Sequence, residues 1–562
     1  MTSGPLGTPD ATAHSRILTS TAVMASGTVV SRMSGFVRST LLVAALGNAL
    51  HADLFNIGNT VPNMIYILVA GGIFNAVLVP QLVRAMRNDA DGGEAYTNRV
   101  VTAAVLFLGL VTILLVAAAP WVMSIYLDSR FDSPELAAQR QSVIDFARYC
   151  LPQVFFYGMF VLVGQILNAR ERFGPMMWAP IANNVIAVAV LVVYLVSFGP
   201  ATEAEQTGPF TSTQELVLGL GSTLGIVAQF LILVPFLRSA GFRFRPRFDF
   251  RDTGLGHTLR LGVWTVLFVV VNQIAYTVVV RLASSGTADT VGGGDGTGYT
   301  IYTYSFLIVM VPHAIITVSL ATAILTRLSE LAAESDVDGL RRTVGMALRS
   351  ALAVVLPFAL LLPLIATDLS HVIWGWGAGQ DDYELFAPTL SLFGAGLVFF
   401  TVHYLVLRGF YALERTRTVF WIQCLVAGTN IVAAIILVRL TDAEATAPAL
   451  VLAYTAAYVV GAAASYLVLR HAVGGLDTGR LLRFVVRLLI AAATSTAAAY
   501  GVHVLLDTLG DDPHLAVAAL RAAAVTLVDV VVFLIAARLL HLREVTDVLD
   551  TITRRLRSRS PA

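Results

Sequence analysis

Two arginines lie inside an apolar stretch near the start of the chain. The segment "SRMSGFVRSTLLVAALG" covers residues 31–47 and carries Arg32 and Arg38 on either side of a Ser34–Gly35 pair. A guanidinium is always charged and presents paired hydrogen-bond donors in one plane, which suits it to bind phosphate. The pair therefore predicts a site for an anionic ligand. The alternative is that each arginine pairs with a carboxylate or with backbone carbonyls.

The depth of these arginines limits where they can point. If the helix begins near Ile17, Arg32 lies about 22 Å along its axis and Arg38 about 9 Å farther. A charge near the bilayer centre costs about 2.5–3.5 kcal/mol, so it must face a bundle interior or a water-filled cavity. Six residues rotate an ideal helix by about 240°, so the two side chains diverge by about 120°. We expect Ser34 and Gly35 to act as a hinge that brings both into one cavity.

The composition sets the class of protein. The chain has 562 residues, of which 57% are hydrophobic and 13% are charged, whereas about a quarter are charged in soluble domains. Its mean hydropathy is +0.76. Apolar runs long enough to cross about 30 Å of hydrocarbon recur along it. We predict an all-α polytopic membrane protein with about fourteen transmembrane helices. The expected helices are 17–47, 53–84, 99–126, 142–168, 178–199, 215–237, 260–284, 299–326, 346–367, 384–408, 417–439, 447–470, 481–506 and 515–540.

The loops alternate in charge along this series of helices. One set is rich in arginine, including "RSAGFRFRPRFDFR" at 238–251, and the other set is acidic or neutral, including "WGAGQDDYE" at 376–384. Positively charged loops stay on the cytoplasmic side of a membrane. The alternation therefore predicts a multi-pass protein with both termini in the cytoplasm.

The longest basic connection divides the chain into two related blocks. "VPNMIYILVAGG" in the second expected helix and "VPHAIITVSLAT" in the eighth share a Val-Pro start. We therefore predict two six-helix lobes related by pseudo-two-fold symmetry, with two appended helices. The predicted parts are a cytoplasmic tail at 1–16, an N-lobe at 17–237, a basic cytoplasmic linker at 238–259, a C-lobe at 260–473, the appended helices at 474–540 and a basic cytoplasmic tail at 541–562.

Three segments carry a resemblance to a known family. They are "SRMSGFVRSTLLVAALGNALHADLFNIGNTVPNMI", "ILNARERFGPMMWAPIANN" and "LRGFYALERTRT". The chain resembles the MurJ/MviN family of the multidrug/oligosaccharidyl-lipid/polysaccharide exporter superfamily. The resemblance implies alternating-access transport of lipid II, the undecaprenyl-pyrophosphate-linked disaccharide-peptide, from the inner to the outer leaflet of a bacterial plasma membrane. It also implies that Arg32 and Arg38 hold the pyrophosphate and that Asp53 is the critical aspartate of the second helix.

The chain departs from that family at charged positions. Neutral residues stand where familiar members carry charges: Tyr66, Ile67 and Gly71 in the second helix, and Leu307 and Met310 in the eighth. The family's sodium site is matched only by Thr429 and Asn430, with Ala434 in place of an acidic ligand. Three functions stay open: lipid II transport, export of a drug or another polyprenyl-linked glycan, and a non-transporting scaffold for cell-wall synthesis.

The remaining polar residues of the expected helices suggest a transporter rather than an enzyme. Asn63, Asn272 and Gln273 are candidate substrate-binding residues, although helix–helix hydrogen bonds would use the same side chains. We find no metal-ligand or catalytic cluster and expect no cofactor, with coupling to the membrane potential or a monovalent ion left open. The expected partners are lipid II, the bilayer and the cell-wall machinery, without nucleic acid. In the last helix, Asp529 is expected to pair with Arg521.

Overall fold

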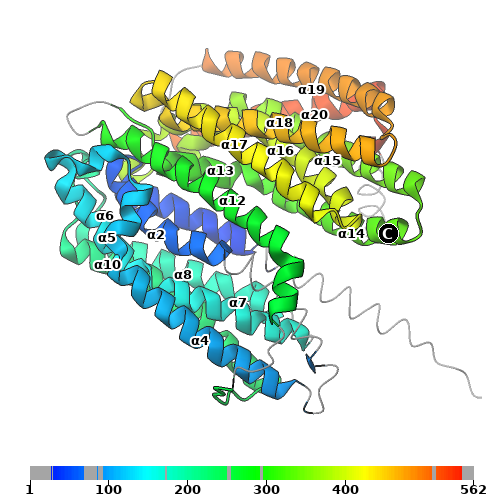
Figure 1. Ribbon diagram of the computed structural model, residues 1–562. Helices are drawn as coiled ribbons and strands as arrows, with labels where there is room; N and C mark the ends of the chain where they lie inside the picture. Colours follow the sequence, from blue (N-terminus) through cyan, green and yellow to red (C-terminus); the bar gives the residue numbers. More distant parts are fainter. Residues whose placement is uncertain are drawn as a thin grey trace, which may run out of the picture.

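The structure is a computed structural model of the chain. It describes residues 27, 30–68, 85–86, 91, 93–170, 172, 174–249, 255–290, 295–508 and 514–546, with the backbone alone for 255–262. Helices and short turns account for the regular structure in these ranges, and no strand occurs among them. The predicted all-α class is therefore confirmed. Figure 1 shows the helices running side by side as one bundle.

The first half of the chain forms one group of helices, which we call the N-lobe. Its first helix covers residues 30–46. The others are α2 (Leu50–Ile67), α4 (Glu94–Ala117), α5 (Ala119–Tyr126), α6 (Ala137–Cys150), α7 (Gln153–Ala169), α8 (Gly174–Phe198), α9 (Glu203–Gln206), α10 (Ser212–Leu231) and α11 (Leu233–Ser239). Two 3₁₀ turns, Ser129–Asp132 and Pro134–Leu136, connect α5 to α6.

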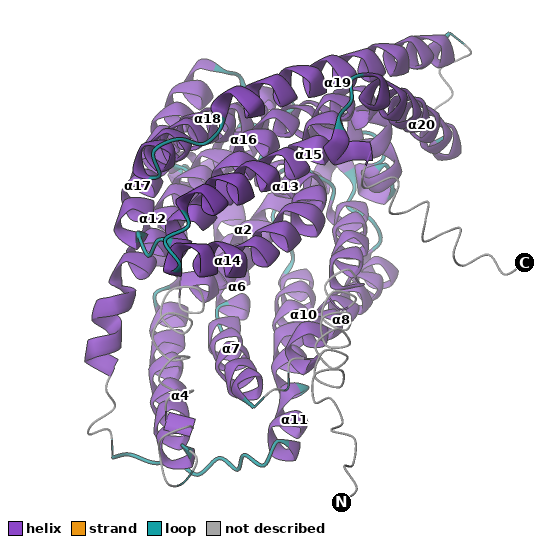
Figure 2. Ribbon diagram, turned by 90° about the vertical axis from the view of Figure 1, so that its right-hand side faces the viewer, coloured by secondary structure: helices purple, strands orange, loops and turns teal. Residues whose placement is uncertain are grey.

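The second half forms the C-lobe and an appended pair. The C-lobe contains α12 (Leu255–Ala288), α13 (Tyr299–Pro312), a π-helical turn (His313–Thr317), α14 (Val318–Ala333), α15 (Val337–Trp374), α16 (Phe386–Ala412), α17 (Thr416–Leu440) and α18 (Thr446–Ala472). The appended helices are α19 (Thr478–Asp507) and α20 (Leu515–Leu539). Both pack against α15. Figure 2 shows them on the side of the C-lobe away from α4, α7 and α10.

Twelve helices within the described residues are long and apolar enough to cross a membrane. They correspond to the third to fourteenth expected helices. The first two expected helices are described only over residues 30–46 and Leu50–Ile67. The remainder of both, with Gly71, lies outside the described residues, so the count of fourteen stays a prediction. The tails at 1–16 and 547–562 also lie outside the described residues.

Three of the expected helices are interrupted in the structure, and a fourth, 299–326, contains a π-helical turn. The segment predicted at 215–237 divides into α10 and α11 at Ile232. The segment predicted at 142–168 divides into α6 and α7 at Leu151–Pro152, and the segment at 99–126 divides into α4 and α5 at Ala118, with Pro120 in the first turn of α5. Proline lacks the N–H that continues a helix and is favoured in a first turn. Hydropathy alone does not resolve such breaks.

The bundle has two ends with opposite charge. We call the end that carries the connections 199–211, 295–298, 375–385 and 441–445 the acidic end. The other end carries 240–249, 334–336, 413–415 and 473–477, and we call it the basic end because arginines of these connections and of the adjoining helix ends outnumber the carboxylates there. In Figure 1 the acidic end is on the left, and the N-lobe and C-lobe helices diverge toward the basic end on the right.

The predicted pairing of Arg521 with Asp529 is wrong. Arg521 instead contacts Asp368 of α15 at 2.5 Å and Asp507 of α19 at 2.7 Å. Asp368 is 2% exposed, so its carboxylate needs a cation, whereas Asp529 lies beside the hydroxyls of Ser495 and Thr496. Arg521 therefore joins the appended pair to the C-lobe.

Candidate functional site

Arg38 lies between the lobes. It projects from the helix 30–46 and is half-buried. Its charge acts on the phenols of Tyr157 on α7, in the N-lobe, and Tyr304 on α13, in the C-lobe. Neither is a carboxylate, and no ion pair of Arg38 with a described residue occurs. The guanidinium is thus placed to receive an anion rather than to neutralise a fixed acid.

Arg32 lies nearer the basic end, on the same helix. It is exposed, and its charge acts on His313 in the π-helical turn of the C-lobe. Arg408 of α16 also acts on His313 and lies over the ring of Tyr404 at 4.2 Å. A third cation is therefore near Arg32. The sequence analysis missed it because the position of Arg408 at a helix end resembles an ordinary loop charge.

The predicted hinge is a continuous helix in this conformation. Residues 30–46 are helical without interruption, and Ser34 accepts a hydrogen bond of 2.8 Å from the side-chain amide of Asn184 on α8. A β-carbon added at Gly35 would meet nothing within 4 Å. The hinge role of Ser34 and Gly35 stays a prediction. The lack of contact at Gly35 shows that close packing is not the reason for the glycine here.

Asp53 occupies a different position from the one expected of a substrate ligand. It has no exposed surface. The backbone N–H groups of Tyr299 and Thr300 donate to its carboxylate at 2.9 and 2.7 Å, and the Thr287 hydroxyl donates at 2.8 Å. The first N–H groups of a helix lack partners within the helix and carry the positive end of its dipole. Asp53 of the N-lobe therefore caps α13 of the C-lobe.

Other hydrogen bonds join the lobes around this cap, at the acidic end. Arg130 contacts Asp289 at 2.8 Å and donates to the carbonyl of Ser285 at 2.9 Å. The Asn48 amide donates to the carbonyl of Asp382 at 2.8 Å, and the Gln206 amide donates to that of Ala378 at 2.9 Å. Because these bonds cross from one lobe to the other, the acidic end is closed in this conformation.

The predicted amide residues come together at a second place between the lobes. Asn63, Asn272 and Gln273 line one pocket of about 350 Å³. The Gln273 amide donates to the carbonyl of Met64 at 2.5 Å, which joins α12 to α2. The Asn272 carbonyl accepts from Gln423 of α17 at 2.7 Å. Asn272 and Gln273 thus make helix–helix hydrogen bonds and also line a pocket, so both uses that the sequence suggested for them are present.

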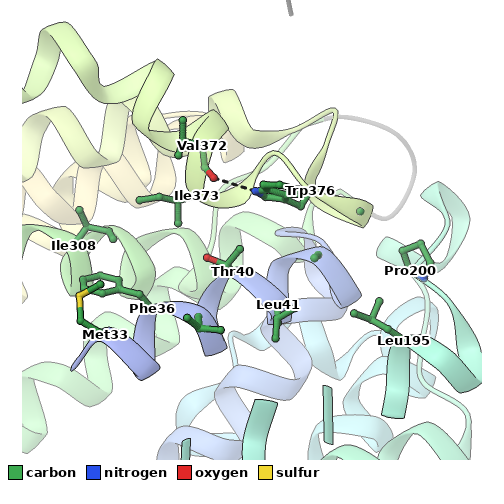
Figure 3. A pocket seen from close by; sticks show the side chains of 13 residues that line it. Met33, Phe36, Thr40, Leu41, Leu195, Pro200, Ile308, Val372, Ile373 and Trp376 are labelled. Carbon is green, nitrogen blue, oxygen red and sulfur yellow. Dashed lines mark hydrogen bonds between the residues drawn. The ribbon is translucent and has the colours of Figure 1, made fainter. Parts of the chain in front are cut away.

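An apolar groove lies on another face of the arginine-bearing helix. It measures about 720 Å³ and runs between that helix, α8, α13 and the end of α15. Figure 3 shows Met33 and Phe36 of the N-lobe helix opposite Ile308, Val372 and Ile373 of the C-lobe. Its lining is almost wholly apolar, and Met33 is 59% exposed. Such a surface suits a hydrocarbon chain.

Comparison with known proteins identifies the family. A family model described as "Lipid II flippase MurJ" matches residues 42–517. The chain belongs to the MurJ family. The match begins after Arg38, so the assignment of the two arginines depends on the motif around them.

Relatives of this MurJ-family chain are distant in sequence. A probable lipid II flippase MurJ of Haemophilus influenzae is 24% identical over 70% of this chain and 75% of its own length. That of Vibrio cholerae is 25% identical over 73% and 75%. The lipid II flippase MurJ of Burkholderia cenocepacia is 24% identical over 70% and 72%. The resemblance seen in the sequence is thereby confirmed.

Solved structures establish the MurJ-like fold. A lipid II flippase MurJ in an inward closed conformation matches with a TM-score of 0.71 and 17% identity, over 93% of this chain and 99% of that chain. An inward-facing MATE-family multidrug resistance transporter of the MOP superfamily matches with a TM-score of 0.60 and 16% identity, over 79% and 95%. The chain is a multi-pass membrane protein of this transporter fold.

Proposed function

We propose that the chain transports lipid II from the inner to the outer leaflet of a bacterial plasma membrane by alternating access. The observation that carries the proposal is membership of a family described as lipid II flippases. The position of Arg38 between the lobes supports it, because a pyrophosphate needs a cation that is not already neutralised. Arg32, with Arg408 nearby, would meet the headgroup first, and Arg38 would hold it deeper.

The two ends of the bundle support a direction of transport. The basic end carries the arginine-rich connections, so it faces the cytoplasm by the positive-inside rule, and both termini lie there. The acidic end, closed by Asp53 and its neighbours, then faces outward. The conformation described would be the one that accepts substrate from the inner leaflet. Opening of the acidic end would release it.

The apolar groove supports a lipid substrate. Polyprenyl chains have no polar groups, and the groove offers an apolar lining beside the same helix that carries the arginines. We propose that the lipid chain stays in this groove while the headgroup crosses between the lobes. We also propose cell-wall synthesis proteins as partners of this chain. An inside-negative membrane potential would favour outward movement of the anionic headgroup, by about 2.3 kcal/mol per charge per 100 mV.

The neutral residues between the lobes support a second candidate function. Neutral side chains stand at Tyr66, Ile67, Leu307 and Met310, so the space between the lobes is less charged than in familiar relatives. A different polyprenyl-linked glycan, or a drug, would be the alternative cargo. The arginines argue against a cationic drug.

The test is the leaflet position of lipid II in cells depleted of their own flippase and expressing this chain. An impermeant probe reports lipid II at the outer face, with wild type beside Arg38→Ala and Arg32→Ala at matched membrane levels. We expect wild type to restore outer exposure and both variants to lose most of it. A correctly inserted wild type that restores nothing would refute lipid II as the cargo. Variants that match wild type would refute the arginine site.

A further inference from the structure

The pocket of about 350 Å³ that holds Asn63, Asn272 and Gln273 has an unusual lining. It lies where α2 meets α12, α13, α17 and α18. Its polar groups are carboxamides and hydroxyls, and no charged residue is among the side chains that line it. The carboxamides are Asn63, Asn272, Gln273, Gln423 and Asn430, and the aromatic rings are Tyr276, Tyr302, Phe306, Tyr454 and Tyr458.

Three polar atoms of this lining have no hydrogen-bond partner among the described residues. They are the side-chain carbonyl oxygen of Asn430 and the hydroxyls of Thr303 and Tyr454, and all three atoms are buried. Tyr454 is only 7% exposed. A buried polar atom without a hydrogen bond is rare in native proteins, because the loss of water is not compensated. These three atoms therefore indicate a ligand that supplies hydrogen bonds.

The side chains that line the pocket also restrict the charge of that ligand. Asn272 and Gln423 bond to each other, and Gln273 bonds to the backbone of Met64. A cation would find no carboxylate in the lining to neutralise it, and a buried charge without a counter-charge is costly. An anion would find no arginine or histidine in the lining. A neutral ligand with hydroxyl or amide hydrogens fits the free carbonyl of Asn430 and the hydroxyl of Tyr454.

The aromatic rings and the volume of the pocket restrict the chemical class of the ligand further. Four tyrosines and a phenylalanine give flat apolar faces, which suit the C–H faces of a sugar ring and the methyl of an acetamido group. The volume is at the low end of the roughly 300–1,000 Å³ of ligand pockets, so it holds a ring or two rather than a whole headgroup.

We propose that this pocket binds a neutral N-acetylated sugar. The inference rests on the proposed function, in which the sugar would be part of the lipid II disaccharide. Tyr304 of α13 lies near Arg38, which belongs to the helix 30–46. Three other residues of α13 line the pocket: Tyr302, Thr303 and Phe306. A pyrophosphate held by Arg38 and a sugar held in the pocket would therefore both lie beside α13.

The pocket also touches the residues that close the acidic end. Tyr276 of the pocket shares a hydrogen bond of 2.8 Å with the hydroxyl of Tyr299, which contacts Thr60 of α2 at 2.8 Å. The backbone N–H of Tyr299 is one of the donors to Asp53. A sugar in the pocket would therefore contact a side chain joined to the Asp53 cap.

The test measures binding by the purified full-length chain in lipid nanodiscs. The probes are lipid II, undecaprenyl pyrophosphate and the soluble disaccharide N,N′-diacetylchitobiose. The variants are Tyr454→Phe and Asn430→Ala, which remove two of the three unpartnered groups, and Arg38→Ala. Tyr466→Phe is the matched control, because this hydroxyl is on the same helix but bonds to Thr478 outside the pocket.

We expect Tyr454→Phe and Asn430→Ala to weaken lipid II and chitobiose binding by about fivefold or more and to leave undecaprenyl pyrophosphate unchanged. Arg38→Ala should weaken both lipids but not chitobiose. Equal affinities of wild type and the pocket variants for lipid II and chitobiose would overturn the sugar site, as would an equal loss for both lipids. If wild type binds neither lipid, the proposed function fails, and chitobiose binding that Tyr454→Phe weakens would still support the sugar site.

Discussion

At the scale of single residues, the difference between arginine and lysine tests the anion site. Arg38→Lys keeps the positive charge but loses the planar pair of donors, and a hydrogen bond to a charged group contributes about 1.5–3 kcal/mol. We expect Arg38→Lys to lower lipid II transport by about tenfold, and Arg38→Ala by more. The measurement is outer-leaflet lipid II at matched expression.

A matched substitution controls for general damage to the bundle. Arg148 of α6 is also an N-lobe arginine but pairs with Asp145 on its own helix at 2.8 Å. Arg148→Lys should leave transport unchanged. Full transport by Arg38→Lys would mean that charge alone suffices, and the bidentate contact with pyrophosphate would be dropped.

The sequence predicts the chemistry of single residues better than their surroundings. Two arginines in an apolar helix indicate an anion site, because a charge inside the membrane must face a polar cavity or a compensating group. Their C-lobe neighbours, Tyr304 and His313, could not be predicted, because each is more than 260 positions away in the chain. Asp53 was predicted as a functional acid, but its contacts with the N-terminus of α13 depend on how the lobes meet.

At the scale of elements, the Asp53 cap of α13 is one of the contacts that join the lobes at the acidic end. Asp53→Asn removes the negative charge and replaces one carboxylate oxygen by an NH2 group, which cannot accept a hydrogen bond from a backbone N–H. Gly298→Ala would place a β-carbon 2.0 Å from the Asp53 carboxylate. Loss of a hydrogen bond to a charged group costs about 1.5–3 kcal/mol. We expect both variants to favour the open acidic end by about tenfold or more.

Cysteine labelling measures that shift. The reporter is Ser284→Cys, because Ser284 has no exposed surface and its hydroxyl accepts from Asp128 of the other lobe at 2.9 Å. The native Cys150 and Cys424 are replaced by alanine. Labelling by an impermeant maleimide should rise in Asp53→Asn and in Gly298→Ala. Asp132→Asn, whose carboxylate pairs with Arg140 in the N-lobe, is the control. Unchanged labelling would show that other contacts hold the lobes together.

The elements themselves follow largely from hydropathy. The third to fourteenth expected helices are present because each needs about twenty apolar residues to cross a bilayer. The breaks at Leu151–Pro152 and Ala118 were missed, since an apolar window averages over a single proline. The π-helical turn His313–Thr317 was also missed, because it follows Pro312 and depends on local hydrogen bonding.

At the scale of the whole molecule, the alternation of loop charge predicts two ends of opposite character, and the structure has them. It does not predict which end is closed, because closure depends on a small difference in free energy between two packed arrangements. Burial, and then the nearby Asp295, Asp381 and Glu203, raise the pKa of Asp382 at the acidic end. Asp295 and Asp381 belong to the C-lobe, as Asp382 does, so only the repulsion from Glu203 acts between the lobes.

A raised pKa makes closure depend on pH. An acid that binds its proton more tightly in the closed state stabilises that state as pH falls through the raised pKa. This contribution is absent at neutral pH and grows as pH falls toward the ordinary aspartate value of about 3.9. Spin labels at Ser129→Cys in the N-lobe and Gln380→Cys in the C-lobe, both exposed, measure the distance across the acidic end. We expect the short-distance population to increase from pH 8 to pH 5. Asp382→Asn should remove most of that increase, and an unaltered increase in this variant would assign the pH response to other groups.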